Sequence, residues 1–402
     1  MSTVSARPAT SEAPAGRSRA IPLLGLAWLH FLNDGAANFL PGILPAILIA
    51  LHAHAASASG IMAALLIGQG LQPFAGWLSD HWGGKALAIL GVSGTTLGLV
   101  LVGESSRLPA LLAALALIGV SNAVFHPQSL ALARSLAHRQ HGATMSIFLV
   151  GGELGRGLYP LIASLAVAHF TTSGLWIVAL PALVSIPLIA PFLPRLAARD
   201  ARTAPVQWRH HAKPATALIT YASLRSFGLY ALVTYLPIVW QHRGGSLVGG
   251  ASLITVLLVV GVLGNVSGGL MADRLGRRIV LAGSSVLSAA LIALYLMSSG
   301  RVLWVILGLL GIAVFSALPV SVLVGQDIFP ENRSLGSGVA LGLGNSLGAL
   351  LLLAFGAATS ALGVHTALWI LPPVALLCAF LATRLPAAAA HKGGGGPMPA
   401  RA

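Results

Sequence analysis

Several ionisable side chains of this sequence lie inside long apolar segments, where a charge is costly. His30 and Asp34 are one helical turn apart in the first segment, and Glu153 and Arg156 have i, i+3 spacing in a later one. A charge at the bilayer centre costs roughly 2.5–3.5 kcal/mol on insertion scales, so a residue kept there is a candidate for function. An Asp–His pair can share a proton, and a buried Glu–Arg pair can exchange its partners for a proton and an anion. We therefore expect proton coupling through Asp34, His30 and Glu153.

These residues also have a purely structural interpretation. Asp34 could form a packing hydrogen bond with Asn33, and Glu153 and Arg156 could simply neutralise each other. Arg225 has no acid one turn away, so its partner comes from another helix, with Asp34 the nearest candidate, or from a bound ligand. Because a guanidinium is a fixed bidentate donor for carboxylate or phosphonate, Arg225 favours an anionic or polar ligand.

Other polar residues of the apolar segments are candidates for lining a ligand cavity. His126 precedes Pro127, which removes a backbone hydrogen bond from its helix, and its imidazole titrates near neutral pH. A packing or capping role is the alternative. The His pairs at positions 52 and 54 and at 210 and 211 have no acid or thiolate company, so we expect no metal site. The predicted substrate-binding residues are Arg156, Arg225, Tyr159, Tyr221, Tyr230, His126 and Asn345.

The composition indicates that these segments lie in a membrane. The chain has 402 residues, of which 56% are apolar and only 8% charged, with a mean hydropathy of +0.87. Soluble proteins carry about 25% charged residues, so this chain has too few charges to cover a surface in water. The single cysteine, Cys378, excludes an internal disulfide, a thiolate zinc cluster and a CxxC redox pair.

Twelve apolar segments are long enough to cross a bilayer, which needs about 20 residues of helix. With the N-terminus in the cytoplasm, 18 of the 23 Lys and Arg residues lie on the cytoplasmic side and three, Arg107, Arg243 and Arg301, on the other. This distribution predicts cytoplasmic N- and C-termini, and it explains the net charge of +14 without a nucleic acid partner. The predicted spans are 21–51, 57–79, 86–103, 109–132, 144–168, 174–194, 215–240, 248–271, 279–298, 302–326, 336–360 and 366–384.

A repeat with an offset of 193 residues divides the spans into two halves. Residues 76–85 and 269–278 share Gly, Asp, Gly and a final cation, and the same offset maps Gly151 and Gly155 onto a second glycine pair. The predicted organisation is a mobile cytoplasmic arm at 1–20, a six-helix bundle at 21–194, a cytoplasmic linker at 195–214, a second six-helix bundle at 215–384 and a mobile cytoplasmic tail at 385–402.

The repeated motif resembles a known family. GLMADRLGRR at 269–278 is similar to the signature loop between helices 2 and 3, and again between helices 8 and 9, of the major facilitator superfamily; the copy at 76–85 is a weaker match. The resemblance implies an all-α polytopic membrane protein with 12 transmembrane helices in two pseudo-symmetric six-helix bundles. HFLNDG at 30–35, FHPQS at 125–129, GGELGRGLYP at 151–160 and TYLP at 234–237 resemble the fosmidomycin-resistance branch of its drug exporters.

The resemblance also implies that the repeated loop is a conformational latch. Asp80 would meet the start of the eleventh span and Asp273 the start of the fifth, where a carboxylate suits the positive end of a helix and stabilises the outward-facing state. The alternative is a tight turn with a positive-inside anchor. The predicted latch residues are Gly76, Asp80, Gly83, Lys85, Gly269, Asp273, Arg274, Gly276, Arg277 and Arg278.

The resemblance and the buried charges together predict a secondary active transporter of the bacterial inner membrane, not an enzyme. We expect a proton-coupled antiporter that exports small polar or amphiphilic drugs by alternating access, and hence antibiotic resistance. A proton-coupled symporter that imports a small organic anion or metabolite is the alternative. The expected partners are a small-molecule substrate, H⁺ and the lipid bilayer, with no cofactor beyond the proton gradient, and the expected state is a monomer.

Other classes of protein fit the sequence less well. A membrane enzyme would need a clustered nucleophile, metal ligands or paired acids near one interface, and a receptor would need a substantial soluble domain. The Gly-rich runs GGELGRG and GLGNSLG lack the preceding strand and the Lys-Ser/Thr ending of nucleotide-binding motifs. Small residues at this spacing instead favour close packing between membrane helices.

Overall fold

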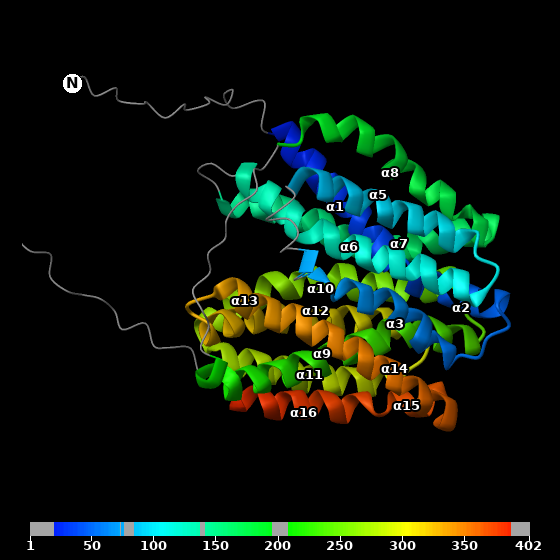
Figure 1. Cartoon of the computed structure of the whole chain (residues 1–402). Coiled ribbons are helices and arrows are strands. Elements are labelled where there is room, and N and C mark those ends of the chain that lie inside the picture. Colours follow the sequence, from blue (N-terminus) through cyan, green and yellow to red (C-terminus); the bar gives the residue numbers. More distant parts are fainter. Residues whose placement is uncertain (1–19, 73, 76–83, 137–140, 195–207, 387–402) are drawn as a thin grey trace, which may run out of the picture.

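The structure, a computed structural model, describes residues 20–72, 74–75, 84–136, 141–194 and 208–386, and every element in these ranges is a helix (Figure 1). The first half contains α1 (Ala20–Asn38), α2 (Leu40–Ala50), α3 (Ser57–Gln69), α5 (Gly84–Gly103), α6 (Leu108–Leu136), α7 (His141–Phe170), η2 (Thr172–Gly174), α8 (Leu175–Ile189) and η3 (Ala190–Phe192). The second half contains α9 (Trp208–His242), α10 (Leu247–Leu275), α11 (Arg277–Met297), α12 (Val302–Ile328), α13 (Arg333–Gly338), the π-helix η4 (Val339–Leu343), α14 (Gly344–Leu362), α15 (Val364–Leu368) and α16 (Leu371–Arg384).

Ten helical segments in the described part of the chain are long and apolar enough to cross a membrane. The first joins α1 and α2, which are separated only at Phe39. The remaining two predicted spans correspond to α3, with 13 described residues, and α7, a 30-residue helix that carries two charges near its middle. α9 begins at Trp208, so it includes the last residues of the predicted linker. The predicted all-α polytopic fold is confirmed.

Equivalent helix pairs pack together in the two halves, as the sequence repeat requires. α1 packs on α7 as α9 packs on α14, α3 on α6 as α10 on α12, and α5 on α8 as α11 on α16. Glycines bring the first of these pairs close together: Gly155 lies against the backbone of Phe31, and its repeat partner Gly348 lies against Ser226 and Phe227. A side chain at either glycine would collide with the facing helix. The two six-helix bundles are therefore pseudo-symmetric.

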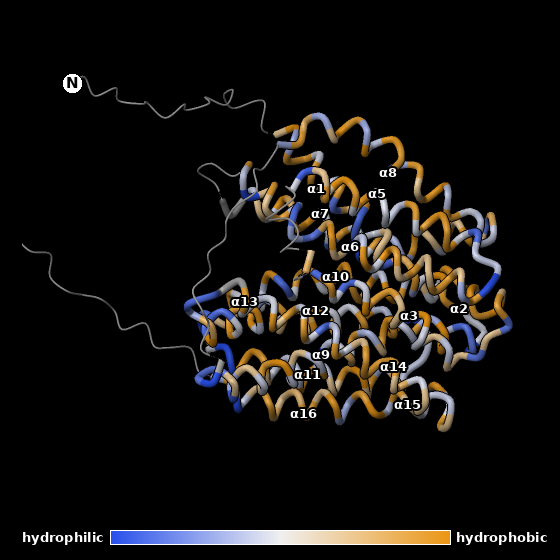
Figure 2. The backbone as a smooth tube through the Cα atoms, in the orientation of Figure 1, coloured by the Kyte–Doolittle hydropathy of each residue, from blue (hydrophilic) through white to orange (hydrophobic). Residues whose placement is uncertain are grey.

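The outer helices present apolar surface. Leu183, Val184 and Leu188 of α8, and Leu376 and Phe380 of α16, are each more than half exposed. Figure 2 shows apolar residues along both helices, which form opposite edges of the molecule. Apolar surface of this extent is unfavourable in water but suits contact with lipid chains.

The two halves meet along α2, α3 and α7 on one side and α9, α10 and α14 on the other. A polar group lies at the end of this interface that is opposite the start of α1. The hydroxyl of Tyr235 is 2.6 Å from Ser59 Oγ and 3.2 Å from Thr359 Oγ1. All three side chains are buried. We call this group the Tyr235 bridge, because its Ser59 contact joins the two halves.

Candidate functional site

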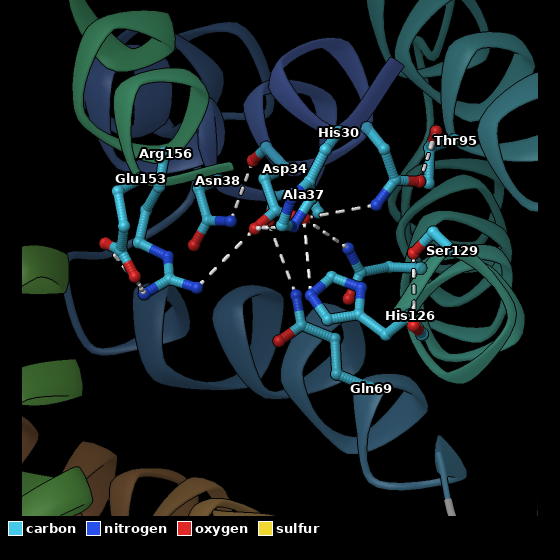
Figure 3. A network of polar contacts seen from close by, with 12 residues as sticks. His30, Asp34, Ala37, Asn38, Gln69, Thr95, His126, Ser129, Glu153 and Arg156 are labelled. Carbon is cyan, nitrogen blue, oxygen red and sulfur yellow. Dashed lines mark hydrogen bonds and ion pairs between the residues drawn. The ribbon is translucent and has the colours of Figure 1, made fainter. Parts of the chain in front are cut away.

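Asp34 lies at the centre of a cluster of charged groups that joins three helices (Figure 3). Its Oδ2 is 3.4 Å from His30 Nε2 and 3.6 Å from Arg156 Nη2, and its Oδ1 is 3.4 Å from His126 Nε2. α1 supplies His30 and Asp34, α6 supplies His126 and α7 supplies Arg156. Two imidazoles and one guanidinium thus converge on a single buried carboxylate.

Neutral polar groups hold this carboxylate in place. Asn33 and Asn122 donate to Asp34 Oδ1 over 3.2 and 3.4 Å, and Thr95 donates to the side-chain oxygen of Asn33 over 3.2 Å. Asn38 donates to the backbone oxygen of Asp34 over 2.8 Å. These bonds fix the position of the carboxylate relative to its cationic neighbours.

The hydrogen bonds of His30 indicate where an exchangeable proton resides. His30 Nδ1 lies 2.9 Å from the backbone oxygen of Phe148, which can only accept, so Nδ1 carries a hydrogen. In a neutral imidazole, Nε2 would then turn a lone pair toward Asp34 Oδ2. This approach is attractive only when a proton lies on Nε2 or on the carboxyl group. The i, i+4 pair singled out in the sequence is therefore in contact, with Nε2 of His30 facing the carboxylate.

Arg156 links Asp34 to a second acid. Its Nη1 lies 3.3 and 3.4 Å from the two carboxylate oxygens of Glu153, as the i, i+3 spacing predicts, while its Nη2 faces Asp34. The side chains of Arg156, His126 and Glu153 are 28%, 27% and 22% exposed, against 3% for Asp34. These three side chains are therefore partly accessible, whereas Asp34 is enclosed.

The same cluster contains the residue types of a metal site. One ligand atom from each of His30, Asp34 and His126 lies within 4.8 Å of the other two. However, the guanidinium of Arg156 is at ion-pair distance from the same carboxylate, and its fixed positive charge opposes a divalent cation. The arrangement therefore disfavours a divalent cation at this position.

The second half contributes a separate polar group around Arg225. Arg225 Nη2 donates to Ser226 Oγ over 3.4 Å, and Ser226 donates to Asn345 over 2.8 Å. Within the described part of the chain, the Nε of Arg225 is buried and has no hydrogen-bond partner, and it lies beside a cavity of about 40 Å³ that Tyr221 also lines. A cavity of this size is large enough for water.

The predicted pairing of Arg225 with Asp34 is wrong. Among the described residues, Asp34 pairs with Arg156 and the two histidines, and Arg225 forms no ion pair with a carboxylate. The reason is geometric, because repeat-equivalent positions on α1 and α9 need not point toward each other across the interface. Arg156, on the helix packed directly against α1, reaches the carboxylate instead.

The other two predicted tyrosines have different surroundings. Tyr159 is 3% exposed and its ring packs edge-on against Phe31, with centroids 5.6 Å apart, which favours a packing role. Tyr230 is half-buried and lies within electrostatic reach of both Arg156 and Arg225. Of the two, Tyr230 is the better placed to contact a ligand held between the halves.

The hydrogen bond between Asn33 and Asp34 that the sequence offered as a packing contact is present. Sequence reasoning missed Asn122, and it gave His126 a ligand-binding or a packing role but no contact with Asp34. Asn122 and His126 are one turn apart on α6, and both reach the same carboxylate oxygen. Their spacing of four residues on an otherwise apolar helix places both on one face, and this pattern could have identified them as a pair in the sequence.

The predicted latch is only partly covered by the described residues. Lys85 Nζ donates to the backbone oxygen of Leu193 over 2.9 Å, and Arg278 Nε donates to that of Leu385 over 2.5 Å. These repeat-related cations therefore bind the carbonyl end of the last helix in their own half, where the helix dipole is negative. The latch residues outside the described ranges are Gly76, Asp80 and Gly83.

The second copy of the loop makes its observed contacts within the second half. Arg277 forms an ion pair with Asp327 of α12, and Gly276, with φ of +88°, forms the turn between α10 and α11. A positive φ favours glycine, which supports the tight-turn alternative. Gly269 has no neighbour within 4 Å of a Cβ position, and Asp273 and Arg274 are exposed. The contact of Asp273 with the start of the fifth span stays a prediction.

Replacing Lys85 or Arg278 with Ala is expected to lower the free energy of unfolding by about 1 kcal/mol each, because a partly exposed charged hydrogen bond is lost. The two effects should add, since the residues lie in different halves. Thermal unfolding of the purified variants in detergent measures both. Arg274→Ala, which removes an exposed cation of the same loop, is the control; an equal loss in that variant would contradict a specific anchoring role.

Comparison with known proteins agrees with this architecture. A family model described as the Major Facilitator Superfamily matches residues 26–268 and 241–399. The chain is 29% identical over 376 residues to an uncharacterized MFS-type transporter, YfnC, of Bacillus subtilis, with 88% of each chain covered. It is 29% identical over 326 residues to the fosmidomycin resistance protein of Escherichia coli, with 77% of each chain covered.

Solved structures share the fold. A crystal structure of the nucleoside transporter NupG matches with a TM-score of 0.79 and 14% sequence identity, covering 91% of this chain and 99% of that one. The predicted resemblance to the fosmidomycin-resistance branch is confirmed by the relative of that name. From the family match along both halves and the repeated helix pairing, the chain belongs to the major facilitator superfamily and is a membrane transporter rather than an enzyme.

Proposed function

We propose that the protein is a proton-coupled antiporter that exports small polar or amphiphilic drugs across the bacterial inner membrane, with both termini in the cytoplasm. The observation that carries this proposal is the convergence of His30, His126 and Arg156 on the buried carboxylate of Asp34. A carboxylate held in this way exchanges its proton only when its partners move, which links protonation to a change of structure.

Antiport requires that drug and proton compete for one site. Glu153, Arg156 and His126 are partly exposed and also balance the charge of the Asp34 cluster. A drug that donates hydrogen bonds to the carboxylates occupies the positions that protons would take, and protonation in turn removes these acceptors. Rocking of the two halves then carries drug and proton in opposite directions. The similarity to a fosmidomycin resistance protein supports export.

Symport of a small organic anion is the second candidate, and Arg225 is the observation that favours it. The acids of the second half, Asp273, Asp327 and Glu331, all lie at its predicted cytoplasmic end, so Arg225 has no acid at its own depth. An anion bound by Arg156 would leave Asp34 short of one cation and ready for a proton. Anion and proton would then move together.

Flux in inverted membrane vesicles distinguishes the two candidates. With the vesicle interior acidified by respiration, antiport predicts that fosmidomycin accumulates inside as protons leave, and that a protonophore abolishes the accumulation. If drug moves only with the protons, or organic anions alone respond to the gradient, antiport is wrong.

The Tyr235 bridge makes a prediction about the conformational cycle. Tyr235→Phe removes the buried hydrogen bond to Ser59 that joins the halves, worth about 1 kcal/mol, and should shift the equilibrium about fivefold toward states in which the halves separate at this end. To measure this opening, Cys378 is replaced with Ala and a cysteine is introduced at Ala56, three residues before Ser59. The rate at which a membrane-impermeant maleimide labels this cysteine reports how often the halves separate. Tyr295→Phe is the control, since its buried hydroxyl has no hydrogen-bond partner. Equal labelling in all variants would contradict the bridge.

A further inference from the structure

A pocket of about 340 Å³ lies where the end of α9 meets α15, away from the Asp34 cluster. Its polar lining comes from His242, Arg243, His365 and Thr366. This is the end of the bundle that the predicted topology places outside the cytoplasm. We propose that the pocket is a binding site for a phosphate-type anion, carried by a phospholipid headgroup or by free phosphate.

Arg243 is the charged anchor of this site. Its Nη1 donates to the backbone oxygen of Ser298 over 3.2 Å, which fixes the guanidinium and leaves most of its five N–H donors for another partner. Among the described residues, Arg243 forms no ion pair with a carboxylate. The hydroxyl of Tyr295 is buried, has no hydrogen-bond partner in the described ranges, and lies within electrostatic reach of the same guanidinium.

The charge distribution at this end of the bundle is compatible with a bound anion. Arg243 is one of only three Lys or Arg residues that the predicted topology places outside the cytoplasm, out of 23 in the chain. Glu104 is the one acid predicted on that side, and it belongs to the other half. Arg243 therefore opposes the usual distribution of cations and, without an acidic partner among the described residues, is available to an anion from solution or from a lipid.

The geometry favours phosphate among anions. A guanidinium binds two phosphate oxygens through parallel N–H donors, and flanking imidazole and hydroxyl groups provide further hydrogen bonds. Close in sequence to residues of the site, Met297 precedes Ser298, and Trp369 and Ile370 follow Thr366; all three are exposed apolar side chains. Tryptophan beside exposed apolar residues is typical of the membrane–water interface, which is the depth of lipid phosphates.

Binding measurements on the purified full chain test this site. Phosphatidylglycerol should raise the thermal unfolding temperature and appear as an adduct in native mass spectrometry, whereas a glucosyl diacylglycerol, which lacks phosphate, should do neither. Arg243→Gln should weaken phosphatidylglycerol binding about tenfold, the loss of one charge-assisted interaction, and Arg243→Lys should weaken it less. Arg301→Gln, which removes another cation from the same end outside the pocket, is the matched control.

A second set of measurements, with inorganic phosphate in place of lipid, distinguishes free phosphate from a lipid headgroup as the ligand. If inorganic phosphate alone stabilises the protein and Arg243→Gln abolishes that stabilisation, the site binds free phosphate. If only phosphatidylglycerol stabilises the protein, the site binds the lipid headgroup. Binding of both probes that is unchanged in Arg243→Gln, or weakened equally in Arg301→Gln, would overturn the proposal. Drug transport is not part of this readout, so the outcome is independent of the proposed antiport.

Discussion

Asp34→Asn is expected to abolish proton-driven drug accumulation while drug exchange continues. Asn keeps the shape of the side chain but cannot alternate between charged and neutral forms, so no proton is carried. In inverted vesicles the ratio of drug inside to outside should fall to one despite an imposed pH gradient. Exchange of labelled drug across the membrane, with drug on both sides and no gradient, should persist because the ligand-accessible residues remain.

Two controls make this prediction specific. Glu104→Gln removes an exposed acid outside the cluster and should transport normally. Thermal unfolding reports whether Asp34→Asn folds; we expect only a modest loss, because Arg156 keeps Glu153 as a partner and the two histidines can become neutral. Accumulation at the wild-type level in folded Asp34→Asn would refute the coupling role.

Arg156→Gln is expected to raise the KM for drug about 10–100-fold, because a ligand-accessible charged donor worth roughly 1.5–3 kcal/mol is lost. Asp34 and Glu153 would also lose their shared cation, so a fall in stability is expected as well. Initial rates of drug uptake at several concentrations measure the KM. Arg156→Lys should recover part of it, since Lys keeps the charge but not the planar fork.

A double variant separates the functional from the structural interpretation of this pair. Glu153→Gln with Arg156→Gln removes both charges, so neither is left unpaired and the unfolding temperature should return toward that of wild type. Transport should stay impaired if the pair handles drug and proton. Recovery of transport together with stability would show that Glu153 and Arg156 only neutralise each other.

The sequence predicted the contacts that lie within one helix. His30 and Asp34 at i, i+4, and Glu153 and Arg156 at i, i+3, must be neighbours on any helix, and both pairs are within ion-pair distance. The helical, polytopic fold and its duplication were likewise predictable, because apolar length and a repeated motif are local properties of the chain.

Contacts between helices were less predictable. A polar stripe shows which residues share one face of a helix, but the sequence does not show which helix that face meets, so the approach of His126 and Arg156 to Asp34 could not be derived. The same uncertainty led to the wrong pairing of Arg225. Tyr159, a polar candidate by residue type, packs in the core because its ring fills space beside α1.

The most direct test of the role of Asp34 is to measure whether drug binding releases or takes up protons. When a drug that carries hydrogen-bond donors and no negative charge, and that wild-type vesicles accumulate, is added to the purified protein in weakly buffered detergent solution at neutral pH, competition at this site predicts acidification of the medium. Asp34→Asn should bind the drug without a change in pH. Proton uptake by the wild type, or equal proton release from both proteins, would contradict exchange of drug for proton at Asp34.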